Sequence, residues 1–308
     1  MKKILVITNA AAGDGDTSVL DAVLDVLRAE RTVQLEATED LDHLDRVFKE
    51  RVDPPEGCDT IVVVGGDGSL HAVVAALHAR GELGDVTLAL VPLGTGNDFA
   101  RSVHLDEDPA EAARQVLASD ARAVDLIIDD TGQITVNAVH LGLGADAGIA
   151  AKPWKDRFGP LGYVVGAAIS GFTKPGVDVS VTIDGKRVRP RGRVLQVAIG
   201  NGRYVGGGTS LLPEADPADG ELDVSVSYAN PLHRRIAYVV SLRFGVHDRR
   251  DDVVYVRGRH VEVAGEEFRL NSDGEISEPT RSRSWRLEQG AFRMLLPATA
   301  PGKDEATA

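Results

Sequence analysis

The sequence predicts an α/β amino-terminal domain with a mainly parallel sheet, followed by a β-rich, sandwich-like domain. Three observations support this prediction. Apolar runs alternate with amphipathic helical segments through about the first 125 residues, strand-like segments dominate the remainder, and glycine-rich loops follow two of the early apolar runs. Alternation of strands and helices is typical of a parallel sheet covered by helices on both faces. The 308 residues are enough for two domains.

The early strands are short, continuous apolar runs, as expected for strands buried on both faces. They span residues 4–7, 33–35, 61–64 and 88–91. Apolar residues at helical spacing predict helices over 17–28, 41–50, 69–79 and 109–118. We expect a first domain over 1–125, joined by a carboxyl-terminal segment 291–308 that carries a last strand at 292–296.

Beyond the first domain, alternating and β-branched residues predict an antiparallel, β-rich domain over 126–290. Its predicted strands span 124–128, 134–139, 177–183, 194–199, 222–228, 253–256, 260–263 and 267–270. Asp184-Gly185 is a hairpin signal. Helical segments are expected at about 160–172 and 231–244.

Composition excludes several classes of protein. Lys and Arg total 34 against 47 Asp and Glu, so the net charge is −13, which argues against broad nucleic-acid binding. Cys58 is the single cysteine, so neither an intrachain disulfide nor a cysteine-based zinc cluster can form. No apolar run approaches the roughly 18–20 residues of a membrane span. We expect a cytoplasmic protein that contacts a membrane only peripherally.

The loop Gly65-Gly66-Asp67-Gly68-Ser69-Leu70-His71 connects a predicted buried strand to a predicted helix. Glycines let the backbone approach a ligand closely, and the N–H groups at a helix start favour an anion such as phosphate. A carboxylate beside a phosphate needs a cation between them, so Asp67 indicates bridging by Mg²⁺. The alternative is a tight strand–helix turn without a ligand.

A second glycine loop, Pro92-Leu93-Gly94-Thr95-Gly96-Asn97-Asp98, follows the next buried strand. Ligands of open α/β sheets bind outside the carboxyl ends of the strands. Two such loops on neighbouring strands therefore indicate one shared ligand.

These motifs resemble those of the diacylglycerol kinase catalytic-domain family of lipid kinases, to which sphingosine and ceramide kinases are related. Ser69 replaces the usual Thr, His71 stands where Asn is frequent, and the loop after the first strand keeps only Asn9 and Gly13 of the family pattern. The resemblance implies an ATP-binding domain, a β-rich lipid-substrate domain and an active site in the cleft between them. It implies nucleotide contacts at Asn9, Thr38, Gly65, Gly66, Asp67, Gly68, Ser69, Leu70, His71, Gly94, Thr95, Asn97 and Asp98.

The same resemblance implies functions for two acidic segments in the second half of the chain. Taken alone, the acidic stretch 213–223 reads as a solvated turn and 270–275 as a hairpin turn. The resemblance implies a structural Mg²⁺ held by Asp216, Asp219 and Glu221. It also implies a carboxylate base that takes the proton of a lipid hydroxyl. Asp273 is the first choice for that base, and Glu275 shares the role or holds a metal-bound water.

The predicted activity is ATP- and Mg²⁺-dependent phosphorylation of a lipid hydroxyl, with diacylglycerol as the first choice of acceptor. The sequence does not identify the lipid, and a homodimer is compatible with it. A basic and aromatic cluster that could contact a membrane comprises Lys152, Trp154, Lys155, Arg157 and Phe158. Two alternatives stay open: a kinase similar to NAD kinases that phosphorylates a soluble acceptor, and a non-catalytic regulator that binds lipid or nucleotide.

Overall fold

The computed structural model describes residues 3–9, 17–51, 58, 60–142, 176–228 and 231–298. The chain forms two compact units: residues 1–124 with 290–308, and residues 125–289. The basic cluster at 152–158, the helix expected at 160–172 and the loop 10–13 lie outside the described residues.

Unit 1 is built on a parallel sheet in the order β2-β1-β3-β4-β18. Its strands are β1 (Lys3–Asn9), β2 (Thr32–Thr38), β3 (Thr60–Gly65), β4 (Thr87–Pro92) and the end of β18 (Thr280–Leu296). Residues 61–65 of β3 and 88–92 of β4 are all buried, as their continuous apolar runs predict. The prediction of a mainly parallel amino-terminal sheet is confirmed.

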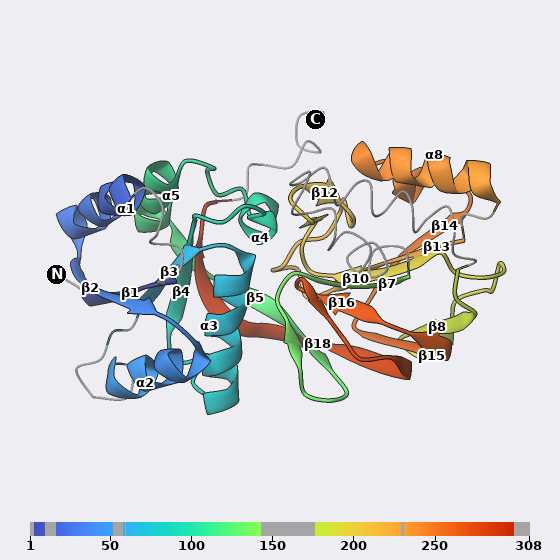
Figure 1. The fold of residues 1–308 in the computed structure, drawn as a ribbon, viewed down its shortest axis with the longest axis horizontal. Coiled ribbons are helices and arrows are strands. Elements are labelled where there is room, and N and C mark those ends of the chain that lie inside the picture. The colour runs from blue at the N-terminus through green and yellow to red at the C-terminus, as the bar shows by residue number, and fades with distance from the viewer. Residues whose placement is uncertain are drawn as a thin grey trace, which may run out of the picture. The chain divides into compact units, whose positions relative to one another are not determined.

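Helices cover both faces of this sheet (Figure 1). The first three are α1 (Thr17–Glu30), α2 (Leu41–Arg51) and α3 (Asp67–Arg80). They are followed by the short α4 (Asp98–Ser102) and by α5 (Pro109–Ala118). In α3, Leu70, Val73, Val74 and Leu77 form the buried face, and Gly81 ends the helix in the left-handed conformation at φ 72°. In α5, the Asp108 side chain accepts from the N–H groups of Ala110 and Glu111.

Unit 2 begins within β5 (Asp120–Asp129) and contains two antiparallel layers. The first has the order β14-β13-β10-β7-β16-β17. It comprises β7 (Ala138–Gly142), β10 (Gln196–Gly200), β13 (Leu222–Ser227), β14 (Val253–Gly258), β16 (Leu270–Ser272) and β17 (Glu275–Ile276). In the second, β15 (His260–Phe268) pairs with β8 (Val179–Ile183) and with residues 280–286 of β18. The expected sandwich-like β domain is confirmed.

A core of aliphatic side chains around Trp285 draws on strands of both layers. The Asp184-Gly185 hairpin joins β8 to β9 (Lys186–Arg187), with φ of 48° and 74° at its two residues. The remaining short strands are β6 (Ile134–Thr135), β11 (Tyr204–Val205) and β12 (Thr209–Ser210). Helix α8 (Leu232–Arg243) and a 3₁₀ turn, η2 (His247–Arg249), lie between β13 and β14 in the chain. No described helix combines the length and apolar character that crossing a membrane requires.

One predicted strand is interrupted. The segment 134–139 was expected to be continuous, but it divides into β6 and β7. The N–H groups of Val136, Asn137 and Ala138 donate to the carboxylate of Asp273. A side chain distant in the sequence therefore replaces a neighbouring strand as their acceptor.

Candidate functional site

The carboxyl ends of four parallel strands form one edge of the unit 1 sheet. Asn9 of β1 is in register with Thr38 of β2, and Gly65 of β3 with Pro92 of β4. Both predicted glycine loops start from this edge, directly after β3 and β4. The structure therefore gathers the predicted nucleotide residues of unit 1 at a single edge of the sheet.

Helix α3 starts at this edge without a side-chain cap. It begins at Asp67, two residues earlier than expected, and its N-cap is Gly66, with no side chain hydrogen-bonded to the helix start. The first N–H groups of a helix have no partners within the helix and carry the positive end of its dipole. A Cβ added at Gly68 would meet no atom within 4 Å. An open, uncapped helix start fits a phosphate group.

The two glycine loops contact each other through their backbones. A Cβ added at Gly94 would lie 2.5 Å from the Cα of Gly66, and Leu93 N donates to Gly65 O at 3.0 Å. Asn97, at φ 52°, closes its own loop: its Oδ1 accepts from Gly94 N and its Nδ2 donates to Gly94 O. The close contact between the loops therefore requires glycine at positions 66 and 94.

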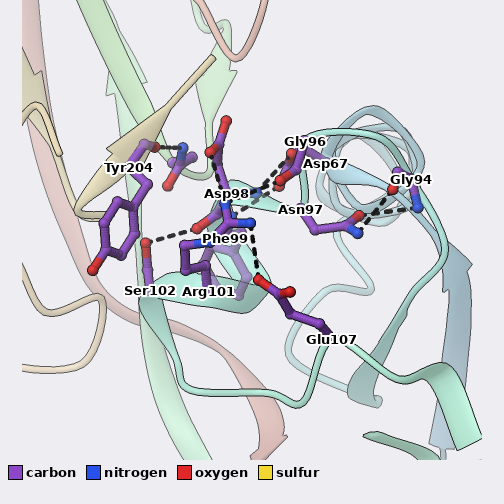
Figure 2. A network of polar contacts seen from close by, with 11 residues as sticks. Asp67, Gly94, Gly96, Asn97, Asp98, Phe99, Arg101, Ser102, Glu107 and Tyr204 are labelled. Carbon is purple, nitrogen blue, oxygen red and sulfur yellow. Dashed lines mark hydrogen bonds and ion pairs between the residues drawn. The ribbon is translucent and has the colours of Figure 1, made fainter. Parts of the chain in front are cut away.

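Asp67 ties the first loop to the second (Figure 2). Its Oδ2 accepts from Asp98 N and its Oδ1 from Phe99 N, each at 2.9 Å. The carboxylate thus caps the start of α4, and both of its oxygens have main-chain donors. The loop-to-loop contact gives Asp67 a structural role, and the Mg²⁺ bridge between this carboxylate and a phosphate stays a prediction.

Arg101 stabilises the second loop from the other side (Figure 2). Its guanidinium donates to Gly96 O at 3.2 Å and pairs with the buried Asp98 at 3.5 Å and with Glu107 at 3.2 Å. Thr95, between the two glycines of this loop, is exposed. The Leu70 side chain belongs to the core, and its N–H donates to Gly66 O at 3.1 Å. Ser69 and His71 are partly exposed on the first turns of α3.

In unit 2, the carboxylate of Asp273 is engaged by main chain. Its Oδ2 accepts from Val136 N at 2.7 Å, and its Oδ1 accepts from Asn137 N at 3.0 Å and Ala138 N at 3.1 Å. Asp273 itself has φ 47°, in the turn between β16 and β17. Glu275 is exposed at the start of β17. Main-chain groups therefore hold Asp273 in place while Glu275 is exposed, and which of the two carboxylates takes a proton stays a prediction.

The acidic loop before β13 gathers around an arginine. Arg257 of β14 pairs with Asp219, with Glu221 at 3.0 Å and with the fully buried Asp223 at 3.5 Å. Burial raises the pKa of Asp223 to about 6, although Tyr255 and Arg257 oppose the rise. The Asp216 carboxylate accepts from Ala218 N within its own turn.

The Mg²⁺ that the resemblance implies at Asp216, Asp219 and Glu221 stays a prediction, and Arg257 supplies a cation at the same loop. The guanidinium of Arg257 faces the carboxylate of Asp219, which the resemblance assigns to the metal, and also that of Glu221. Two further main-chain oxygens of the loop, of Ala215 and Gly220, accept from Arg203 and Arg259. Among the described residues, no three His, Cys, Asp or Glu side chains are grouped so as to hold a metal ion.

Both units match domains of known protein families. Residues 3–128 match the diacylglycerol kinase catalytic domain, and residues 137–295 match the YegS C-terminal NAD kinase beta sandwich-like domain. A Stenotrophomonas maltophilia protein named "Probable lipid kinase YegS-like" is 35% identical over 83% of this chain and 84% of its own length. A Pseudomonas aeruginosa protein of the same name is 34% identical over 97% of this chain and 96% of its own.

Solved structures agree on the fold. A crystal structure from Bacillus anthracis strain Sterne aligns with a TM-score of 0.79 and 25% identity over 97% of both chains. Another from the same strain, described as a diacylglycerol kinase, has a TM-score of 0.74 at 23% identity, covering 97% of this chain and 98% of its own. The two matched domains and the curated relatives agree with the paired glycine loops. The chain therefore belongs to the YegS-like lipid kinase family, whose members contain a diacylglycerol kinase catalytic domain.

Proposed function

We propose that the protein transfers the γ-phosphoryl group of ATP, bound with Mg²⁺, to the hydroxyl of a lipid, with diacylglycerol as the first acceptor to test. The proposal rests on the start of α3, which has no side-chain cap. The space there is open, because a Cβ added at Gly68 would meet no atom within 4 Å. The relatives named for lipid kinase activity support the acceptor class.

In unit 1, main-chain N–H groups at the start of α3 bind the phosphates, and Thr95 supplies an exposed hydroxyl. Asn9 and Thr38 extend the same edge of the sheet toward the remainder of the nucleotide. Asp67, Asn97 and Arg101 contribute indirectly, because they hold the two loops in one arrangement. Preorganised donors of this kind stabilise charge on a phosphoryl group without rearranging during the reaction.

In unit 2, Glu275 is the proposed general base and Asp273 is a positioning residue. A lipid hydroxyl is a weak nucleophile, and removal of its proton by a carboxylate contributes typically ~10²–10⁴-fold. The proton moves to Glu275 as the lipid oxygen attacks phosphorus and the bond to the ADP oxygen breaks. Asp273 fixes the main chain of 136–138, beside which the turn carrying Glu275 is formed.

The test is transfer of labelled phosphate from ATP and Mg²⁺ to dispersed diacylglycerol, phosphatidylglycerol, ceramide and sphingosine. Glu275→Gln is expected to reduce kcat at least 100-fold and to leave the KM for ATP unchanged. The matched control is Glu278→Gln, three residues further along the chain and also exposed, which is expected to retain activity. If Glu275→Gln retains activity while Asp273→Asn loses it and stays folded, the base assignment is reversed.

A second, soluble acceptor is also tested. The description of the domain matched by residues 137–295 refers to the sandwich of NAD kinases, so NAD is included as a soluble acceptor. Labelled NAD without labelled lipid would replace the lipid proposal. ATP binding without transfer to any acceptor would favour a non-catalytic regulator.

A further inference from the structure

Among the described residues, helix α8 packs on unit 2 through one face. Tyr238 and Leu242 on that face are buried in a small core with Leu195, Ala198, Leu211, Leu212, Ala215 and Val253. The Tyr238 hydroxyl donates to Gln196 Oε1 at 2.9 Å. Figure 1 shows the helix along the outside of the unit, in orange. This anchoring fixes which side chains of α8 point outward.

The outward face carries a continuous apolar stripe. Leu232, Ile236, Val240 and Phe244 recur every four residues, a spacing that aligns them on one side of a helix. Their exposed fractions are 50%, 46%, 53% and 72%. Five of the eight exposed large apolar side chains in the described residues lie between positions 232 and 246. Scattered apolar residues are normal on a surface, but a gathered patch marks an interaction site.

Arginines accompany this stripe in an otherwise acidic chain. Residues 231–250 contain five Arg and a single acidic residue, Asp248, whereas the whole chain has a net charge of −13. Arg234 and Arg250 pair with Asp251 and Asp252. Arg243, in the last turn of α8, and Arg249, in η2, are exposed, and neither has an ion pair among the described residues. This surface therefore combines apolar and cationic groups, although the protein as a whole repels anions.

We propose that the α8 face, defined as Leu232, Ile236, Val240, Arg243, Phe244 and Arg249, docks on an anionic lipid bilayer. Apolar side chains on an amphipathic helix enter the boundary between headgroups and acyl chains, and arginines remain at the level of the phosphates. Nucleic acid would not require the apolar stripe, and an apolar protein groove would not require the arginines. The inference does not depend on the kinase proposal, because bilayer binding is measured without nucleotide or turnover.

The experiment is co-sedimentation of the full chain with vesicles made of equal parts phosphatidylglycerol and phosphatidylcholine, or of phosphatidylcholine alone. The protein is expected to bind the anionic vesicles at least tenfold more tightly. Ile236→Glu with Phe244→Glu is expected to lower the partition coefficient at least tenfold, since both side chains leave water on docking. Arg243→Gln with Arg249→Gln is expected to weaken binding roughly fivefold per arginine and to reduce its dependence on salt.

Leu41→Glu is the matched control, because Leu41 is a 63% exposed apolar residue on α2 in unit 1. It is expected to leave vesicle binding unchanged. All variants are checked by circular dichroism, and their exposed positions predict unchanged melting. In Phe244→Trp, the emission is expected to shift to the blue on addition of anionic vesicles, beyond any shift of the wild type.

Three results would overturn the inference. The first is equal binding by the wild type and the Ile236→Glu, Phe244→Glu variant. The second is failure of the folded wild type to bind anionic vesicles. The third is self-association of the wild type that the same double variant abolishes while vesicle binding persists, which would assign the α8 face to contact between two copies of the chain.

Discussion

The carboxylate of Asp67 holds the main chain of Phe99, with Oδ1 accepting from Phe99 N at 2.9 Å, while Oδ2 accepts from Asp98 N. Asp67→Asn places an amide group against one of these donors. A buried N–H that loses its acceptor costs about 1–3 kcal/mol, so α4 should be locally destabilised. We expect faster hydrogen exchange in residues 94–102 and a KM for ATP raised about tenfold, as the loop geometry relaxes.

A metal-bridging role for Asp67 would give a different pattern. If Asp67 mainly holds Mg²⁺, excess Mg²⁺ should restore the KM of Asp67→Asn and hydrogen exchange in 94–102 should not change. The control is Asp106→Asn, since the Asp106 carboxylate also accepts a main-chain N–H, from Asp108, but lies outside the two glycine loops. It is expected to leave the KM for ATP unchanged.

The variants Gly68→Ala and Gly94→Ala distinguish two roles of the glycines: leaving room for the nucleotide, and allowing the two loops to pack. A Cβ at Gly94 would overlap the backbone of Gly66, whereas one at Gly68 would meet no atom within 4 Å. Gly94→Ala should therefore lower stability by about 1–3 kcal/mol and weaken ATP binding. Gly68→Ala should weaken ATP binding while melting stays the same or rises, because alanine is favoured in a helix.

Equilibrium ATP binding and thermal unfolding followed by helical circular dichroism measure both effects. Unchanged ATP affinity in a folded Gly68→Ala variant would contradict phosphate binding at the start of α3. Unchanged melting of Gly94→Ala would contradict the tight contact between the loops.

The parts of the site that follow a local rule were predictable from the sequence. The runs at 61–64 and 88–91 are continuously apolar and end in glycines, so two buried strands leading into two loops could be predicted. The same reasoning missed the burial of Leu70, although its spacing with Val73, Val74 and Leu77 is a usable signal for a core face. Resemblance to the family supplied Thr38, which lies beside Asn9 only because β1 and β2 pair in that register.

Contacts between distant residues could not be predicted. Asp273 and Asn137 are 136 positions apart, and nothing local to either indicates that one carboxylate replaces a strand as acceptor for 136–138. Arg257 and Asp219 meet because β13 and β14 are neighbours, with Asp223 in register with Arg257. Taken alone, the acidic loop indicated a solvated turn, and the arginine that faces it could not be predicted without the sheet pairing.

Arg257 is expected to act as the internal cation of the acidic loop. Chelation of divalent metals should therefore leave the melting of wild-type unit 2 unchanged. Arg257→Ala leaves the buried Asp223 without its ion-pair partner, and such losses cost about 3–5 kcal/mol. Added Mg²⁺ should partly restore the melting temperature of this variant. Emission of the buried Trp285 in a Trp154→Phe background reports on unit 2, since the chain has two tryptophans.

The control for this prediction is Arg286→Ala, which removes an exposed ion pair of β18 with Glu288. Exposed pairs contribute about 0–1 kcal/mol, so little change is expected. A wild-type protein whose unit 2 melts several degrees lower in chelator would show that the acidic loop holds a resident metal.

His140 should make unit 2 sensitive to mild acid. It is buried in β7, and burial lowers its pKa from 6.5 to about 4. The unfolded chain then binds a proton at this position below about pH 6.5, whereas the folded chain does not until about pH 4. This contribution is present at pH 7 and declines as the pH falls through that window, by about 2 kcal/mol between pH 7 and pH 5.

The contribution of His140 is measured by comparing the pH dependence of the free energy of unfolding in the wild type and in His140→Gln. The other titrating groups are common to both proteins. Asp223 is one of them, and its raised pKa has the opposite effect: the folded state becomes relatively more stable as pH falls through about 6. Urea unfolding of the two proteins, followed by Trp285 emission, should give stability curves that converge by about 2 kcal/mol from pH 7 to pH 5. Parallel curves would mean that His140 titrates normally in the folded protein.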